Sequence, residues 1–255
     1  MLKIDLNCDL GESFGNYTLG MDREILPLIS SANVACGFHA SDPCVMAESA
    51  RIAKAAGTAV GAHPGFPDLM GFGRRNMTVT KEEARDYVLY QLGALDAFLK
   101  AEGLRMQHVK PHGALYNMAA VDRSLADAIA GAIKEYNSDL IVLALFGGEL
   151  EKASRDAGLR TASEFFADRA YNTDGTLVSR SIPGSTITDE NAAIERTVRM
   201  VREKKVTTID GIDIDVDCCS VCVHGDNPKA LEFVQKIREG LAAEGIVIAP
   251  MGEIV

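Results

Sequence analysis

Short apolar runs alternate with longer helical patterns along almost the whole sequence. The helical segments carry apolar residues at every third or fourth position, and several of them end at a glycine just before the next apolar run. Because a strand, a helix and a second strand in series form a right-handed crossover, this alternation predicts an α/β protein with a parallel sheet. The runs that we interpret as buried strands are 2–6, 32–36, 58–62, 107–110, 140–145, 161–165, 218–223 and 246–249.

The helices predicted between these strands have recognisable starts. Thr80 stands three residues before Glu83, which is the spacing of a capping box, and Pro43 follows Asp42 where a first turn is expected. The predicted helices are 42–56, 81–102, 122–136, 149–157, 189–204 and 228–244.

Four of the five histidines stand at or just after the end of a predicted strand, each beside Gly or Pro: His39, His63, His112 and His224. Other polar residues follow nearly every strand as well. A doubly wound sheet concentrates its site at one switch point, whereas a barrel builds its site from all the loops at one end. We therefore expect a TIM-like (β/α) barrel of seven or eight strands, with room for irregularity in its second half.

Length and charge narrow the class of protein further. The chain has 255 residues, a length common for one α/β barrel, and no segment resembles a linker, so we expect one domain spanning residues 1–255. The net charge of -10 argues against a nucleic acid or an anionic membrane as a partner. The N-terminus lacks the pattern of a signal peptide, and no apolar run approaches the roughly 20 residues that cross a bilayer. These features predict a cytoplasmic protein. Cysteines in or beside predicted strands, Cys8, Cys36, Cys218 and Cys222, are interpreted as reduced core thiols, and the alternative is a metal or redox role for the C-x-x-C pair Cys219 and Cys222.

The segment 5–15 places three oxygen-bearing side chains near one strand end. Asn7, Asp9 and Glu12 lie close to two glycines that let the backbone turn. Such a cluster suits metal ligation, a general base or the binding of polar substrate groups. The alternative is a turn in which the Asn and Asp side chains cap backbone amides. A functional role is favoured, because the turn does not need Glu12.

Two of the histidines suggest a metal site. With Asp9, His39 and His63 would make a triad for a divalent metal. The spacing is not the compact helical one of H-E-x-x-H. Catalysis or substrate binding by these imidazoles without a metal therefore remains an alternative.

Three cationic side chains follow other predicted strands. Arg74 comes after a pair of glycines, Lys110 ends a strand, and Arg169 lies in a later loop. Guanidinium and ammonium groups suit a carboxylate or a phosphate. The chain lacks the G-x-x-x-x-G-K-[ST] phosphate loop, so an anionic ligand is better supported than ATP in particular.

Six blocks of sequence lie in order along the chain: 5–15, 32–43 (ANVACGFHASDP), 61–75 (GAHPGFPDLMGFGRR), 109–117 (VKPHGALYN), 164–171 (EFFADRAY) and 223–228 (VHGDNP). Together they resemble the signature blocks of the family of the 5-oxoprolinase A subunit, also called the LamB/YcsF family. One departure is Ser41, where the family often carries Gly. The resemblance implies a barrel similar to the glycoside hydrolase/deacetylase superfamily. It also implies ATP-dependent hydrolysis of 5-oxo-L-proline to L-glutamate, ADP and phosphate, together with partner subunits B and C.

The candidate residues fit this chemistry in two roles. Five residues could act as general acids or bases, or could orient water or the Mg²⁺ that accompanies the co-substrate ATP. We expect two of them, Asp9 and His63, to be essential. The five are Asp9, Glu12, His39, His63 and His112. Binding of the substrate or of the phosphoryl group suits Asn7, Arg74, Lys110, Arg169 and His224. Two alternatives remain open, a metal-dependent deacetylase or amidohydrolase and a non-catalytic substrate-binding subunit.

Overall fold

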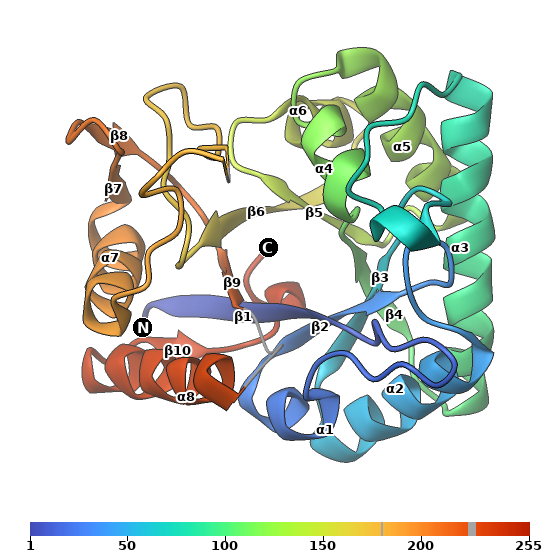
Figure 1. Ribbon diagram of the computed structural model, residues 1–255, viewed down its shortest axis with the longest axis horizontal. Helices are drawn as coiled ribbons and strands as arrows, with labels where there is room; N and C mark the ends of the chain where they lie inside the picture. Colours follow the sequence, from blue (N-terminus) through green and yellow to red (C-terminus); the bar gives the residue numbers. More distant parts are fainter. Residues whose placement is uncertain (180, 224–227) are drawn as a thin grey trace.

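Seven parallel strands close into a barrel in the computed structural model, which describes residues 1–179, 181–223 and 228–255 (Figure 1). The ring is closed by pairing of its first and last strands, Asp5 lying opposite Ser220 and Cys8 opposite Val223. In ring order the strands are β1 (Lys3–Leu10), β2 (Ser31–Ala35), β3 (Ala59–His63), β4 (Met106–Val109), β5 (Ile141–Leu145), β6 (Arg160–Phe166) and β9 (Ser220–Val223). The prediction of a TIM-like barrel is confirmed.

Helices follow the strands and surround the ring (Figure 1). Both predicted caps are present: Thr80 and Glu83 form the complete capping box, and the Asp42 side chain accepts hydrogen bonds from the first turn of its helix. The long helices are α2 (Pro43–Ala56), α3 (Lys81–Ala101), α5 (Arg123–Tyr136), α6 (Glu149–Asp156), α7 (Glu190–Glu203) and α8 (Pro228–Ala243). The short ones are α1 (Asp22–Ile25) and α4 (Gly113–Ala119), with 3-10 turns at Leu26–Leu28, Leu69–Gly71 and Met251–Glu253. Among the described residues, no helix combines the length and the apolar character needed to cross a membrane.

The irregularity expected in the second half lies between β6 and β9. That stretch contains α7 and a small antiparallel hairpin of β7 (Lys205–Thr207) and β8 (Asp213–Asp215), neither of which joins the ring. The predicted strand at 246–249 is β10 (Val247–Ile248), which pairs with the start of β1 outside the ring. The following C-terminal turn brings Met251 against Ile141 and Leu143, and this apolar group lies at the end of the barrel where β1 begins.

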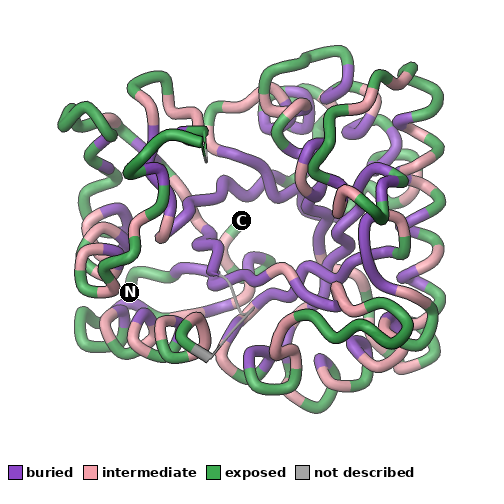
Figure 2. Tube along the Cα trace, viewed as in Figure 1, coloured by how far each residue is buried: buried purple, intermediate pink, exposed green. Residues whose placement is uncertain are grey.

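The first strand is longer than its apolar run predicts, because polar residues that face the inside of the barrel alternate with apolar ones in its second half. Ile4, Leu6, Cys8 and Leu10 belong to the hydrophobic core. Most of this strand is buried (Figure 2). The intervening Asp5, Asn7 and Asp9 bond to side chains of other strands. The expected end at residue 6 was therefore wrong, and so was the alternative in which Asn7 and Asp9 belong to a turn.

Hydrogen bonds between side chains of different strands offset the cost of burying these polar groups inside the barrel. Asn7 donates to Ser220 Oγ at 2.7 Å and accepts from Asn33 at 2.8 Å. The His108 ring donates to Asn33 Oδ1 at 2.7 Å. Gly61 leaves room for that ring, since a Cβ on Gly61 would lie 2.3 Å from it. The barrel interior is thus packed around polar pairs that pin the strand register.

Asp5 is a fully buried titratable group of this interior. Ser30 and Ser31 donate to its Oδ1, and Ser220 donates to its Oδ2. Burial outweighs these three hydrogen bonds and raises the pKa of Asp5 to about 6, against about 3.9 for an ordinary aspartate. A raised native pKa means that the folded state binds the proton more tightly. The stabilisation of the folded state by protonated Asp5 is complete below the pKa that Asp5 has in the unfolded chain. It is lost as the pH rises through the pKa that Asp5 has in the folded protein.

We therefore expect the wild type to lose about 3 kcal/mol of unfolding free energy, relative to Asp5→Asn, between about pH 4 and pH 7. Urea unfolding of both proteins across that range measures the difference, and the Asn side chain serves as the reference that does not titrate. A carbon-13 NMR titration of the Asp5 carboxyl group in the wild type gives the same pKa directly. Stability curves that run parallel across the range would contradict the assignment.

Candidate active site at the mouth of the barrel

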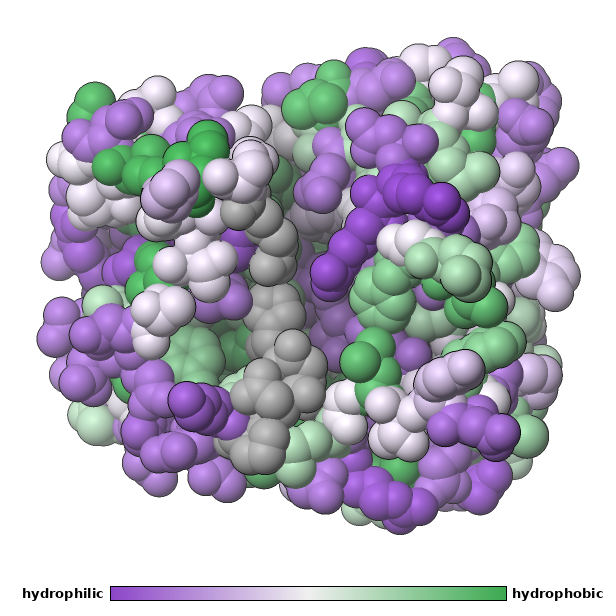
Figure 3. All heavy atoms as spheres, viewed as in Figure 1, coloured by the Kyte–Doolittle hydropathy of each residue, from purple (hydrophilic) through white to green (hydrophobic). Residues whose placement is uncertain are grey.

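Two cavities adjoin each other at the carboxyl ends of the strands. The larger, of about 450 Å³, is lined by Asp9, His63, Lys110 and His112 among others. The smaller, of about 400 Å³, shares Asp9 and His112 with it and adds Glu12. The molecule is visibly hollowed on this face, and hydrophilic atoms border the hollow (Figure 3). This is the end of a barrel where active sites are built.

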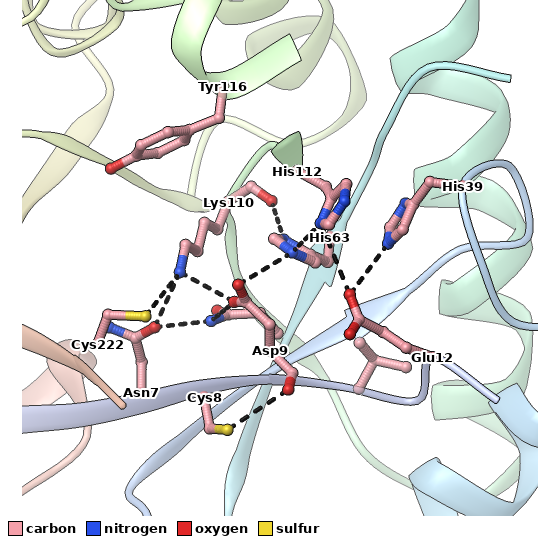
Figure 4. Close-up of polar contacts among 12 residues, drawn as sticks. Asn7, Cys8, Asp9, Glu12, His39, His63, Lys110, His112, Tyr116 and Cys222 are labelled. Atoms are coloured by element: carbon pink, nitrogen blue, oxygen red, sulfur yellow. Dashed lines mark hydrogen bonds and ion pairs between the residues drawn. The ribbon is translucent and has the colours of Figure 1, made fainter. Parts of the chain in front are cut away.

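Lys110 lines the larger cavity and is held by two carboxylates, those of Asp9 and Glu164. Figure 4 shows its contacts with Asp9, Asn7 and Cys222. Its Nζ is 2.9 Å from Asp9 Oδ1 and 2.7 Å from Glu164 Oε1, with Asn7 Oδ1 at 3.3 Å and Cys222 Sγ at 3.4 Å. Burial opposes the charged form, but Asp9, Cys222 and Glu164 together raise the pKa of Lys110 well above its usual range. Lys110 is therefore a permanent ammonium that positions both carboxylates.

Glu164 and Tyr116 are site residues that the sequence analysis missed. Glu164 is fully buried on β6, and its Oε2 accepts a hydrogen bond from the Tyr116 hydroxyl at 2.7 Å. Burial and the adjacent Glu164 raise the pKa of Tyr116 well above its usual value, so the hydroxyl remains a donor. Both residues stand in the blocks EFFADRAY and VKPHGALYN, and a carboxylate inside a strand was the available signal.

Asp9 connects the lysine to the imidazoles. Its Oδ1 accepts from Asn33 at 2.8 Å as well as from Lys110, and its Oδ2 lies 3.4 Å from His63 Nε2. Burial acts to raise the pKa of Asp9, but His63 and Lys110 lower it well below the usual value. Asp9 is thus an ionised carboxylate at the wall that the two cavities share.

His39, His63 and His112 form one cluster (Figure 4). The rings of His39 and His112 are stacked with centroids 3.7 Å apart, and His63 Nε2 lies 3.0 Å from His112 Nδ1. Burial and the two neighbouring imidazoles lower the pKa of His112 to about 2. Burial and His63 likewise lower the pKa of His39 well below its usual value. The sequence prediction that these histidines converge agrees with the structure.

Glu12 faces this cluster from the loop after β1. Its Oε1 lies 3.4 Å from His39 Nε2 and 3.6 Å from His112 Nδ1. Burial raises the pKa of Glu12. Among the described atoms, Glu12 Oε1 has no hydrogen-bond partner, and neither ring nitrogen of His39 has one.

The remaining predicted residues occupy different positions. Arg74 is exposed and lines both cavities, whereas Arg169 is buried, lines the larger one and donates to the Val178 carbonyl at 2.6 Å. Asn7 lies beneath Lys110 with its side chain fully buried, so it supports the lysine from inside the barrel. His224 lies outside the described residues.

Comparison with known proteins decides the family. Residues 4–255 match the sequence model of the LamB/YcsF family. This chain belongs to the LamB/YcsF family. A relative from Clostridium beijerinckii, named as the A subunit of 5-oxoprolinase, is 59% identical over 254 residues that cover 100% of both chains. A protein of the same name from Bacillus subtilis is 54% identical over 253 residues, covering 99% of this chain and 98% of its own length.

A solved structure shares the fold of this LamB/YcsF protein throughout. The crystal structure of the lactam utilization protein from Thermus thermophilus superposes with a TM-score of 0.93 at 52% identity, covering 97% of this chain and 99% of its own. The blocks on which the family resemblance was based supply the described site. Asp9 and Glu12 come from the first block, His39 from the second, His63 from the third and Lys110 from the fourth. Ser41, where the family resemblance led us to expect Gly, has a positive φ of 76°, a conformation that Gly ordinarily occupies.

Proposed function

We propose that this chain is the A subunit of a 5-oxoprolinase, a complex that hydrolyses 5-oxo-L-proline to L-glutamate with conversion of ATP to ADP and phosphate. The observation that carries the proposal is the 59% identity, over full length, to a relative named as the A subunit of 5-oxoprolinase. The name of the Thermus protein, lactam utilization protein, agrees with a cyclic amide as the substrate class. Because the reaction consumes ATP, we expect it to take place in the cytoplasm.

The chemistry explains why ATP is consumed. A five-membered lactam resists hydrolysis because its amide is stabilised and its ring readily forms again. Transfer of the γ-phosphoryl group to the lactam oxygen makes the carbonyl carbon a better electrophile. Water then adds to that carbon, and the ring C–N bond breaks as the nitrogen takes a proton, which leaves an acyl phosphate. A second water hydrolyses this acyl phosphate to L-glutamate and phosphate.

The described residues supply several of the groups that this reaction needs. Asp9, ionised and fixed by Lys110, is the candidate base for the attacking water. Arg74 and Arg169 line the cavity and supply positive charge for the substrate carboxylate or the phosphoryl group, with Mg²⁺ accompanying the nucleotide. Glu164 and Tyr116 fix Lys110 from the opposite side.

The test is an ADP-release and glutamate-formation assay with 5-oxoproline, run on the chain alone and on the chain with subunits B and C. We expect equal amounts of ADP and glutamate only when all the subunits are present. Proline, which has the same ring and carboxylate without the lactam carbonyl, is the matched control and should release no ADP. Absence of glutamate from the complete set, or hydrolysis without ATP, would overturn the proposal, and the second result would favour a metal-dependent amidohydrolase.

A further inference from the structure

Three imidazoles and a carboxylate converge at the mouth of the barrel (Figure 4). His63, His112 and Glu12 line the two cavities, and the buried His39 packs against them. One ligand atom from each of Glu12, His39, His63 and His112 lies within 4.8 Å of the others. Glu12 and His39 follow β1 and β2, His63 ends β3, and His112 begins α4 after β4. The closed order of the strands, rather than any local spacing, brings the four together.

The hydrogen bonds fix which nitrogen of two rings carries the proton. His63 Nδ1 lies 2.7 Å from the Lys110 carbonyl oxygen, and His112 Nε2 lies 2.8 Å from the Phe72 carbonyl oxygen. A carbonyl only accepts, so each of these nitrogens is the donor. In the neutral rings the lone pairs then lie on His63 Nε2 and His112 Nδ1, which face each other at 3.0 Å. Two facing lone pairs at this distance require a cation between or beside them.

The other two members, Glu12 and His39, present buried polar atoms that have no hydrogen-bond partner in the described part of the chain. Glu12 Oε1 is buried and unpaired, and His39, fully buried, has no hydrogen bond at either ring nitrogen. Leaving buried polar atoms unpaired is costly, so such atoms gathered at one point indicate a ligand. The backbone carbonyls behind His63 and His112 complete the usual surroundings of metal-binding histidines, which donate their second N–H to a carbonyl or carboxylate.

We infer that Glu12, His39, His63 and His112 bind one divalent transition-metal ion of the Zn²⁺ class. For metal–nitrogen distances of about 2.0–2.1 Å, neighbouring ligands of a tetrahedral ion lie about 3.3 Å apart. The separations here of 3.0, 3.4 and 3.6 Å bracket that length. The remaining distances between ligand atoms, none of which exceeds 4.8 Å, are expected to shorten when the ion binds.

The donor set selects the kind of ion and differs from the triad expected from the sequence. Three imidazole nitrogens favour zinc and its transition-metal neighbours over Mg²⁺, which prefers oxygen. The group of mutually close ligand atoms contains Glu12 and His112 in place of Asp9, whose Oδ1 already accepts hydrogen bonds from Lys110 and Asn33. When bound, such an ion supplies a Lewis acid at the wall that the two cavities share.

The test measures binding by the isolated chain after removal of metals with a chelator. Titration calorimetry with Zn²⁺ and elemental analysis after dialysis should give one ion per chain. Co²⁺ should give the visible absorption of a four-coordinate ion. His112→Gln and Glu12→Gln should each weaken Zn²⁺ binding by at least about 100-fold, since even loss of an outer partner costs roughly 10–100-fold. Zn²⁺ should raise the unfolding temperature of the wild type and leave that of both variants unchanged.

Two matched controls exclude other binding sites. Glu24→Gln removes an exposed carboxylate of α1, and Cys44→Ser removes the exposed thiol, so both should bind Zn²⁺ as the wild type does. Absence of stoichiometric binding by the wild type would overturn the inference and leave a proton as the shared cation. Unchanged affinity in both site variants would overturn it as well. Because binding is measured without substrate, a chain that binds zinc yet supports no 5-oxoproline turnover would refute only the proposed function.

Discussion

Lys110→Met is expected to reduce the free energy of unfolding by about 3–5 kcal/mol, which is the cost of removing one partner from a buried ion pair. The substitution keeps the length of the side chain but leaves Asp9 and Glu164 without the ammonium that lies within 3 Å of both. Turnover of 5-oxoproline should fall by at least about 10²–10³-fold, because the carboxylate that meets the water is no longer held in place. Urea unfolding and the ADP-release assay measure the two effects.

Two further variants separate these effects. Lys110→Met combined with Glu164→Gln removes the ammonium and one of its two carboxylates, so part of the lost stability should return while the activity does not. Lys100→Met is the matched control. Lys100 on α3 is exposed, and its buried partner Asp96 keeps a hydrogen bond from the Tyr136 hydroxyl, so loss of this pair should cost about 0–1 kcal/mol. If Lys110→Met unfolds at the same urea concentration as Lys100→Met, the two carboxylates do not depend on this ammonium.

The barrel itself was predictable because its signals are local. Apolar runs mark the strands, Thr80 and Asp42 mark helix starts, and the glycines mark helix ends. The predicted strands all exist, and their ends differ from the structure by a few residues. The clearest error, the early end of the first strand, arose because Asn7 and Asp9 interrupt an apolar run. Only closure of the barrel creates a polar interior in which such residues continue a strand.

The convergence of the imidazoles was also predictable, since parallel strands bring their carboxyl ends to one rim. The partners of those imidazoles were not. Glu164 lies within an apolar run, and the face of the strand that it occupies depends on register with β5 and β9. The choice between Asp9 and Glu12 as the neighbour of His39 depends on the path of the loop after Leu10. The strand register and the loop path are both properties of the assembled barrel, so the periodicity of apolar residues along the chain does not predict them.

Asp9→Asn is expected to lower kcat by about 10²–10⁴-fold, the usual contribution of a positioned general base. The asparagine oxygen can still accept from Asn33 and Lys110, so the geometry around it is kept while the charge that takes the proton is lost. Lys110 retains Glu164 as its counter-ion, and the loss of stability should therefore be much smaller than in Lys110→Met. The assay is the complete set of subunits at saturating 5-oxoproline and ATP.

Asp122→Asn is the matched control for this substitution. Asp122 is exposed and caps α5 through the backbone of Ser124 and Leu125, a role that asparagine fills equally well. Its turnover and stability should match those of the wild type. His63→Ala, which removes the ring beside Asp9, should abolish turnover as well. Near-normal kcat in Asp9→Asn would show that the water is activated elsewhere, and the carboxylate would then serve only to hold Lys110 in the interior of the barrel.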